Sequence, residues 1–438
     1  MNMVIRDDYL EKLIESWKKE APPVHSISYL DQLREDALDC IESLRLPTIR
    51  DEEWRFTDIS SLRSMPFPRA SVAPLPELDK QADTFFDETA CKLVFVDGQY
   101  APGLSSLTDD GSITVYSLSG LANAYVSMAE QCLGQLARFQ ENVFVALNTA
   151  LMHDGVCVVI PAGVSVKAPV HILYVTSRKD VAVYPRCLLI AEPEASVTVI
   201  EEYVTLHEDA SLTNAVTEMY IRDSACVNHV RVQRESPQAF HIANDSVLVA
   251  QSARYESVSL ALGARISRFD QNITLAGGNA ECEVDGLVLI AGRQLADTHT
   301  FIDHANPHCR SRQLHKCIVD ESAHGVFSGK IMVRPHAQQT DARQLNRNLL
   351  LSDKARMDTK PQLEIFADDV KCAHGATVGQ LDNESLFYLQ SRGLTEVAAR
   401  NLLTYAFGGE VINRVVVPSL KQRLEEYILA RTRILVKS

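Results

Sequence analysis

The chain has 438 residues, of which 46% are hydrophobic, and its formal net charge is −14. This length allows a sizeable core, and the acidic balance argues against nucleic acid or an anionic membrane surface as partner, because both attract a basic face. No apolar run reaches the ~20 residues that span a bilayer, and the N-terminus resembles neither a signal nor a transit peptide. We therefore expect a cytoplasmic protein.

The lack of common cysteine motifs and of a phosphate-binding motif argues against several functions. The ten cysteines never form Cys-x-x-Cys, which argues against a zinc ribbon or a thioredoxin-like site. Without a secretion signal we expect reduced, mostly buried thiols. The pair Gly329-Lys330 has the wrong spacing for a phosphate-binding loop and precedes Ile331. We expect no nucleotide to be bound by this chain.

The first 85 residues are predicted to be helical and then irregular. Stretches 9–20 and 28–46 carry apolar residues at helical spacing, and Pro47 is expected to end the second helix. The Pro-rich stretch 69–80 indicates a linker. Residues 86–155 are expected to form an irregular connecting region.

Residues 156–381 have a different sequence pattern, with short β-rich runs separated by polar turns. Alanines recur before these runs at intervals often close to 14–15 residues or a multiple, starting at Ala195. This repeat favours a β-solenoid in which each coil covers its neighbour, with a small residue at each tight corner. An antiparallel sandwich is the alternative, but Asn-Gly and Asp-Gly hairpin signals are scarce. We predict a mainly β protein with a solenoid core.

Helical periodicity returns in a C-terminal domain, 382–438. One helix is expected to start at Asp382 and end at Gly393, and a second to start after Thr395 and stop at Gly408-Gly409. A last helix carries a stripe of Leu420, Leu424, Tyr427 and Ile428. These helices would either cap the edge of the solenoid, where backbone groups are unpaired, or dock a partner.

The segment KCAHG places Cys372 and His374 two positions apart, on the same face of a strand. Three interpretations of this pair are open: a half-site for iron or zinc, an activated thiol beside an imidazole, or two residues of the core. A nearby protonated imidazole or Lys371 would lower the pKa of the thiol and favour the thiolate, which binds metal or accepts sulfur. Mixed Cys/His ligation suits both iron–sulfur clusters and zinc.

A second group of seven His and Cys residues lies between 299 and 324 and matches no tight zinc spacing. Either solenoid strands stack these side chains in hydrogen-bonded ladders, or the group contacts a metal or cluster. Its members are His299, His304, His308, Cys309, His315, Cys317 and His324.

Two other functions fit a solenoid. A carbohydrate-active β-helix enzyme would use clustered carboxylates, such as Asp368 and Asp369, with a histidine. Such enzymes are usually secreted, whereas this chain has ten apparently free thiols. A structural homo-oligomer without a cluster role is the other alternative.

Several ordered motifs resemble the SufB/SufD family of the SUF iron–sulfur cluster assembly system, and its SufD branch in particular. They are RDEEWRFTDIS (50–60) and, from 299 onward, SRQLHK, GVFSGKI, DTKPQLEI, KCAHGATVG and LFYLQSRG. The resemblance implies a right-handed parallel β-helix core between helical N- and C-terminal regions. It also implies a non-enzymatic subunit.

The same resemblance implies partners and a cofactor. The β-helix would pair with SufB, or with a second copy of this chain in isolation, and the C-terminal helices would bind the SufC ATPase. A transient, nascent iron–sulfur cluster would form at the shared interface with SufB, with His374 as a ligand and Cys372 as a possible auxiliary ligand.

Departures from the sister SufB pattern imply an incomplete site. Gly375 replaces a carboxylate in the motif, and LNRNLLLS (345–352) lacks the thiol expected of SufB. This chain alone would therefore be short of cluster ligands, and the partner would complete the coordination.

Overall fold

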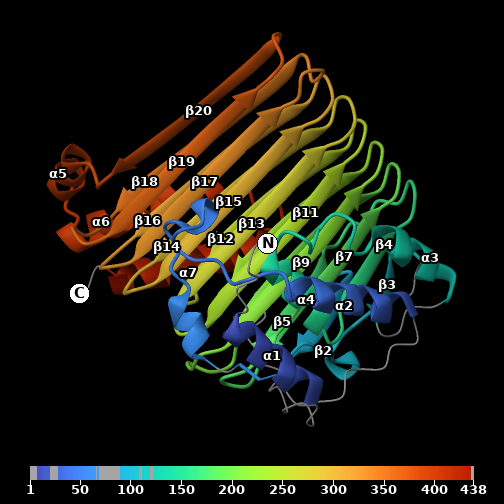
Figure 1. Ribbon diagram of the computed structural model, residues 1–438. Coiled ribbons are helices and arrows are strands. Elements are labelled where there is room, and N and C mark those ends of the chain that lie inside the picture. Colours follow the sequence, from blue (N-terminus) through green and yellow to red (C-terminus); the bar gives the residue numbers. More distant parts are fainter. Residues whose placement is uncertain are drawn as a thin grey trace.

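The computed structural model describes residues 7–19, 28–65, 67–68, 89–107, 111–118 and 123–435. Its centre is a parallel β-solenoid of about 8 turns, formed by two 10-stranded sheets (Figure 1). This confirms the predicted β-helix core between helical regions. Parallel pairing along both sheets excludes the antiparallel sandwich.

Consecutive strands of the solenoid alternate between the sheets. Sheet 1 contains, in spatial order, β2 (Gln99–Tyr100), β1 (Cys91–Val96), β5 (Val170–Thr176), β8 (Ser196–Thr205), β10 (Cys226–Gln233), β12 (Arg254–Ala261), β14 (Glu281–Ile290), β16 (Arg310–Val319), β18 (Thr340–Leu350) and β20 (Val370–Gly379). Sheet 2 contains β3 (Thr114–Ser117), β4 (Val156–Ile160), β7 (Arg186–Ala191), β9 (Leu212–Ile221) with β6 (Ala182–Val183) beside it, β11 (Phe240–Val249), β13 (Ile266–Leu275), β15 (Leu295–His304), β17 (His324–Val333) and β19 (Arg356–Ile365).

The alanine repeat marks one strand and its corner, so that two repeats make one coil. Ser196 of β8 pairs with Cys226 of β10, which pairs with Arg254 of β12. At the corner before each of β8, β10, β12, β14 and β16, a residue with positive φ precedes a buried small residue, as in Glu194-Ala195. Equivalent pairs are Ser224-Ala225, Ser252-Ala253, Asn279-Ala280 and His308-Cys309. The corner selects a small residue because its side chain points into the core.

Alternation along the strands creates one interior and two outer faces. The interior holds mostly aliphatic side chains, such as Val197, Val199 and Ile273. Burial of this continuous apolar column is the main stabilising contribution to the coils.

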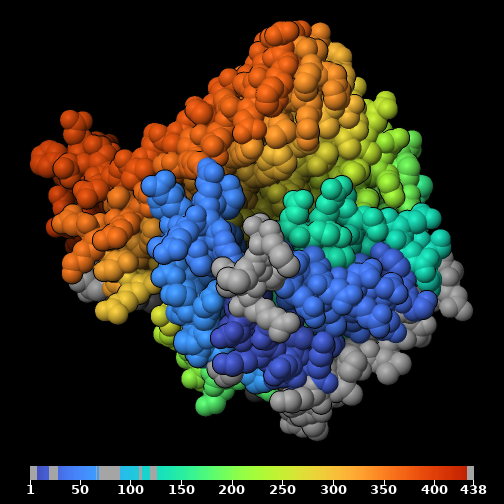
Figure 2. Space-filling model, viewed as in Figure 1, coloured from blue at the N-terminus to red at the C-terminus, as the bar shows by residue number. Residues whose placement is uncertain are grey.

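The N-terminal helices cover the outer face of sheet 2 (Figures 1 and 2). The two predicted helices are present, although α2 ends at residue 41, well before Pro47. The linker predicted at 69–80 lies outside the described residues. The helical elements of this half are α1 (Asp8–Lys19), α2 (Ser28–Ile41), η1 (Glu52–Trp54), η2 (Ser60–Ser64), η3 (Pro102–Leu104), α3 (Asn123–Cys132) and α4 (Val143–Leu151).

The C-terminal helices are α5 (Asn383–Ser391), α6 (Glu396–Ile412) and α7 (Pro418–Leu435). Their caps confirm the predicted starts, since Asp382 accepts a hydrogen bond from the backbone of Ser385 and Thr395 one from Ala398. The predicted stop at Gly408-Gly409 is wrong. The helix continues because Gly408 lies against the sheet, where an added Cβ would be 3.5 Å from Leu287.

The prediction that these helices cap the solenoid edge is also wrong. Leu420, Leu424 and Ile428 of α7 are buried against the outer face of sheet 1, together with the end of α6. This face carries its own apolar residues, which favour that packing. Within the described part of the chain, β19 and β20 each have a strand partner on one side only.

The predicted domain boundaries, 1–85, 86–155, 156–381 and 382–438, remain a prediction about folding units. In the structure β1, within the predicted connecting region, already pairs with β5 in sheet 1. All ten cysteines are free, and seven are buried, as expected for reduced thiols. Among the described residues, no helix combines the length and apolar character required to cross a membrane.

Candidate functional site

Strand β20 presents Cys372 and His374 at the open end of the solenoid. Cys372 is half-buried and packs against the interior apolar cluster, so both side chains belong to the inward-facing set. His374 is nevertheless exposed, because no further coil covers the last strand. In Figure 2 the C-terminal end of the solenoid, coloured orange, extends beyond the N-terminal helices.

The interior row behind His374 is polar. His374 is in register with Gln344, which is in register with Gln313. The Gln344 amide donates to Oε1 of Gln313 at 2.6 Å, while its own Oε1 is buried without a hydrogen-bond partner. Among the described residues, no hydrogen bond or ion pair involves the imidazole of His374. The row therefore ends in an imidazole that is accessible to an external group.

The expectation of an activated thiol at Cys372 is wrong for the isolated chain. Partial burial raises the pKa of Cys372, and the carboxylate of Asp341 adds to the effect, which a backbone hydrogen bond from Ala342 only partly opposes. The Lys371 side chain, one residue away, points to the opposite face of the strand. The thiol is therefore protonated at neutral pH, and a bound cation or a partner's charge would be needed to favour the thiolate.

The structure does not bring the seven His/Cys residues of 299–324 together. His299 and His324 lie on the outer face of sheet 2, where His324 contacts Asp358 at 2.7 Å. His308 and the buried Cys309 form a corner. His304, His315 and Cys317 are buried in the interior.

The interior members of this group have close protein neighbours. His304 contacts the hydroxyl of Ser311 at 2.8 Å, and burial lowers the pKa of His304 to about 4. Burial also lowers the pKa of His315 to about 3 and raises that of Cys317. Both imidazoles are therefore neutral at pH 7. Space for His315 depends on Gly286, where an added Cβ would be 2.3 Å from its Nδ1.

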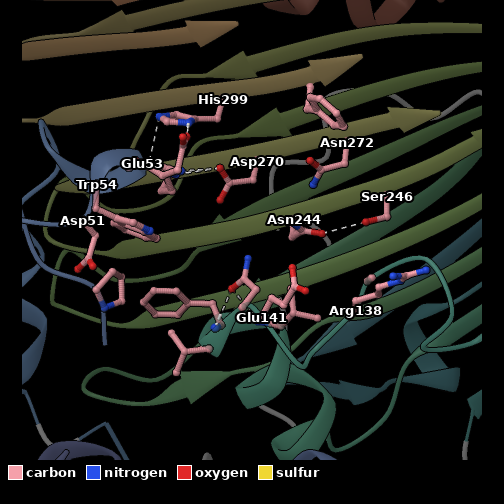
Figure 3. A pocket seen from close by; sticks show the side chains of 18 of the residues that line it. Asp51, Glu53, Trp54, Arg138, Glu141, Asn244, Ser246, Asp270, Asn272 and His299 are labelled. Carbon is pink, nitrogen blue, oxygen red and sulfur yellow. Dashed lines mark hydrogen bonds and ion pairs between the residues drawn. The ribbon is translucent and has the colours of Figure 1, made fainter. Parts of the chain in front are cut away.

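His299 instead joins the N-terminal segment to sheet 2 (Figure 3). Its Nδ1 is 3.2 Å from a carboxylate oxygen of Glu53, and its Nε2 is 3.0 Å from Asp297. The guanidinium of Arg268 lies over Trp54, 4.4 Å from the ring centroid. Apart from Asp297, these residues border a groove of about 910 Å³ between the N-terminal segment and the outer face of sheet 2.

Sequence reasoning missed a buried group formed by Glu201, His229 and Asp245, whose ligand atoms all lie within 4.8 Å of one another. The sequence signal for this group was the alternation of side chains between the two faces of a strand, called strand parity below. Glu201 shares a face with Val197 and Val199, so an apolar alternation continues into a carboxylate. Parity alone does not show which charged residues on other strands lie opposite.

Comparison with known proteins gives the same family as the sequence motifs. Residues 174–407 match the family model described as "SUF system FeS cluster assembly, SufBD core domain", and residues 6–172 match the "SufBD protein N-terminal region". The chain is 41% identical to an iron–sulfur cluster assembly SufBD family protein of Synechocystis, over 92% of each chain. It is 33% identical to the iron–sulfur cluster assembly protein SufD of Escherichia coli, over 86% of this chain and 88% of that one.

A more distant relative shows the same likeness over nearly the full length. The chain is 27% identical to SufD of Bacillus subtilis, over 97% of each chain. None of these matches supports a carbohydrate-active enzyme or a purely structural homo-oligomer. Two family models that together span residues 6–407, and a relative above 40% identity, place this chain in the SufBD family of the SUF iron–sulfur cluster assembly system.

Proposed function

We propose that this SufD-like protein is a non-catalytic subunit of a SufBCD complex in the cytoplasm, and that a nascent iron–sulfur cluster assembles at its interface with SufB. The observation that carries the proposal is the exposure of His374 on the last strand of the solenoid. In this role the cluster is cargo, held transiently by ligands from two chains. The free thiols of the chain accord with a reducing compartment.

The open end offers a surface for a second β-helix. Strands β19 and β20 leave backbone groups unpaired on their outer sides within the described chain, and another parallel solenoid would extend both sheets. Exposed apolar residues at this end are Ile365, Phe366 and Val378. Their burial would favour association, whether with SufB or, in its absence, with a second copy of this chain.

His374 would contribute one imidazole ligand at this interface, with Cys372 as an auxiliary ligand. A neighbouring chain would supply the remaining ligands, since these two side chains cannot complete a cluster. Division of the ligands between two chains has a functional advantage, because separation of the chains would weaken the coordination and release the cluster.

The SufC ATPase would dock on α5 and α6. No residue of α5 is buried, and Phe387 and Tyr388 are 72% and 57% exposed. Leu402 of α6 and Tyr388 line a shallow groove between the two helices. A surface with this much exposed apolar area is typical of a protein contact.

Contacts beneath α6 would transmit movement of the ATPase to the sheet. The ammonium group of buried Lys316, on β16, donates to the Phe407 carbonyl at 2.8 Å and pairs with Glu410 at 2.5 Å. A force on α6 would therefore act on sheet 1, whose last strand is β20. We propose that ATP-driven dimerisation of SufC reshapes the SufB interface in this way.

The test is anaerobic cluster formation by the reconstituted three-protein complex, followed by absorbance. His374→Ala should leave assembly of the complex intact, measured by size-exclusion chromatography, but abolish cluster formation. His336→Ala, at an exposed histidine in a turn, is the matched control and should behave like the wild type. Normal cluster formation by His374→Ala would refute the ligand assignment.

A further inference from the structure

The interior of the solenoid contains three metal-ligating side chains that the proposed function does not use. Glu201 of β8, His229 of β10 and Asp245 of β11 are 0%, 1% and 2% exposed. Nε2 of His229 is 3.0 Å from a carboxylate oxygen of Glu201, and its Nδ1 is 3.9 Å from Oδ2 of Asp245. Two strands of sheet 1 and one of sheet 2 thus bring one ligand atom from each side chain within 4.8 Å of the other two.

Asp245 indicates that this group lacks a component. Its Oδ2 atom is buried and has no hydrogen-bond partner, although an unpaired carboxylate oxygen inside a protein is costly. An apolar residue in place of Asp245 would avoid that cost. A cation bound to Oδ2 would remove it.

The surrounding residues orient the other two side chains. The Thr217 hydroxyl donates to Oε1 of Glu201 at 3.0 Å, and the Tyr255 hydroxyl lies 3.1 Å from Nδ1 of His229. Gln271 donates to the same tyrosine oxygen at 3.2 Å. Outer contacts of this kind fix the ring and carboxylate positions at protein metal sites.

Charge balance also favours a cation. Three buried carboxyl groups lie in this part of the interior, those of Glu201, Asp245 and Glu235, against the single guanidinium of Arg231. The second buried imidazole there, His241, is 2.6 Å from Glu235. In the metal-bound form, with all three carboxyl groups ionised and both imidazoles neutral, three negative charges and one positive would leave two negative charges. A divalent ion would neutralise them.

We propose that Glu201, His229 and Asp245 bind one divalent transition-metal ion, of the Fe²⁺, Mn²⁺ or Zn²⁺ class, as a resident structural metal. One imidazole with two carboxylates suits these ions, whereas Mg²⁺ and Ca²⁺ favour oxygen ligands alone. The site goes beyond the proposed function. It lies five strand steps from His374, roughly 24 Å at the usual strand spacing.

The experiment is refolding of the full chain under anaerobic conditions with Mn²⁺, Fe²⁺ or Zn²⁺ alone, because a buried site is filled most readily during folding. After gel filtration, metal content is measured by mass spectrometry. We expect about one ion per chain and a thermal unfolding temperature above that of protein refolded with a chelator. Metal-free protein in all three refolding experiments would overturn the proposal.

Variants separate this site from the cluster site. Asp245→Asn should lose the ion, and Thr217→Val should bind it ~10–100-fold more weakly, as for other residues that orient ligands. The double variant Cys372→Ala/His374→Ala should keep it. Retention by Asp245→Asn, or loss in the double variant, would overturn the proposal.

A spectroscopic measurement avoids reliance on variants that fail to fold. Co²⁺ bound by the wild-type chain should show visible d–d bands without the ultraviolet charge transfer of a thiolate ligand. A cobalt–thiolate spectrum would place the ion at cysteine and overturn the assignment. Failure of the proposed cluster function would leave this result unchanged, since no step here involves SufB or SufC.

Discussion

Glu53 and His299 are 246 positions apart in the sequence, yet Oε2 of Glu53 lies 3.2 Å from Nδ1 of His299. This contact fastens the N-terminal segment to sheet 2. Burial alone would lower the pKa of His299, but the charge and hydrogen bond of Asp297, together with the hydrogen bond to Glu53, outweigh burial and the opposing charge of Arg268. The pKa of His299 is therefore raised to about 9.

The raised pKa predicts a pH-dependent contribution to stability. The protonated imidazole stabilises the folded state fully below the unfolded pKa, near 6.5, and the contribution is lost as pH rises through 9. His299→Gln should therefore lower the free energy of unfolding by up to about 3 kcal/mol at pH 6, and by much less at pH 10. Denaturant unfolding of both proteins at pH 6, 8 and 10 measures the difference.

An exposed histidine is the control for this pH dependence. His336→Gln removes an imidazole from a solvent-exposed turn, and its stability should track that of the wild type at each pH. A constant difference between wild type and His299→Gln from pH 6 to pH 10 would contradict the ion-pair assignment.

The fold was largely predictable because its signals are local. The corner before each of β8, β10, β12, β14 and β16 combines a residue at positive φ with a buried small residue, as in Glu194-Ala195. Helix starts at Asp382 and Thr395 depend on contacts within three residues. The stop at Gly408 was mispredicted because the glycine serves a tertiary contact with Leu287 rather than a helix end.

The candidate site was only partly predictable. Strand parity correctly placed Cys372 and His374 on one face, but their exposure depends on which coil is the last. The pKa of Cys372 was misjudged because partial burial and the carboxylate of Asp341 raise it, whereas the prediction considered only nearby positive charge. The group of Glu201, His229 and Asp245 depends on pairing between coils, which periodicity does not reveal.

Gly286 provides a test of interior packing next to His315. Gly286→Ala would place a Cβ 2.3 Å from Nδ1 of His315, so we expect a loss of roughly 1–3 kcal/mol in the free energy of unfolding, as for other overpacked cores. Gly379→Ala, on exposed β20 with no atom within 4 Å of the added Cβ, should have little effect. Urea unfolding compares the two.

A double variant identifies the cause of that loss. Adding His315→Ala to Gly286→Ala removes the clashing ring, so the two changes should be clearly non-additive. Additive effects would show that the destabilisation arises elsewhere in the core.

Exposed Phe387 tests the proposed docking surface on α5 and α6. Deletion of the whole C-terminal domain is a poor test, because α6 and α7 cover apolar residues of sheet 1 such as Leu287. A point substitution is sharper. Phe387 is 72% exposed, so Phe387→Asp should leave the free energy of unfolding nearly unchanged. It should weaken SufC binding at least ~30-fold, since an aromatic anchor commonly contributes ~2 kcal/mol or more to an interface.

The matched control for this docking test lies on α7. Ala430→Asp introduces the same charge at an exposed position of α7, away from the groove between α5 and α6, and should bind SufC normally. Calorimetric titration of SufC into each purified variant gives the dissociation constants. Equal weakening by both variants would indicate a general effect of added negative charge on an already acidic chain. Normal binding by Phe387→Asp would show that the ATPase binds another surface. Only selective loss at Phe387 supports docking on α5, because the two substitutions differ in the apolar contact they remove and not in the charge they add.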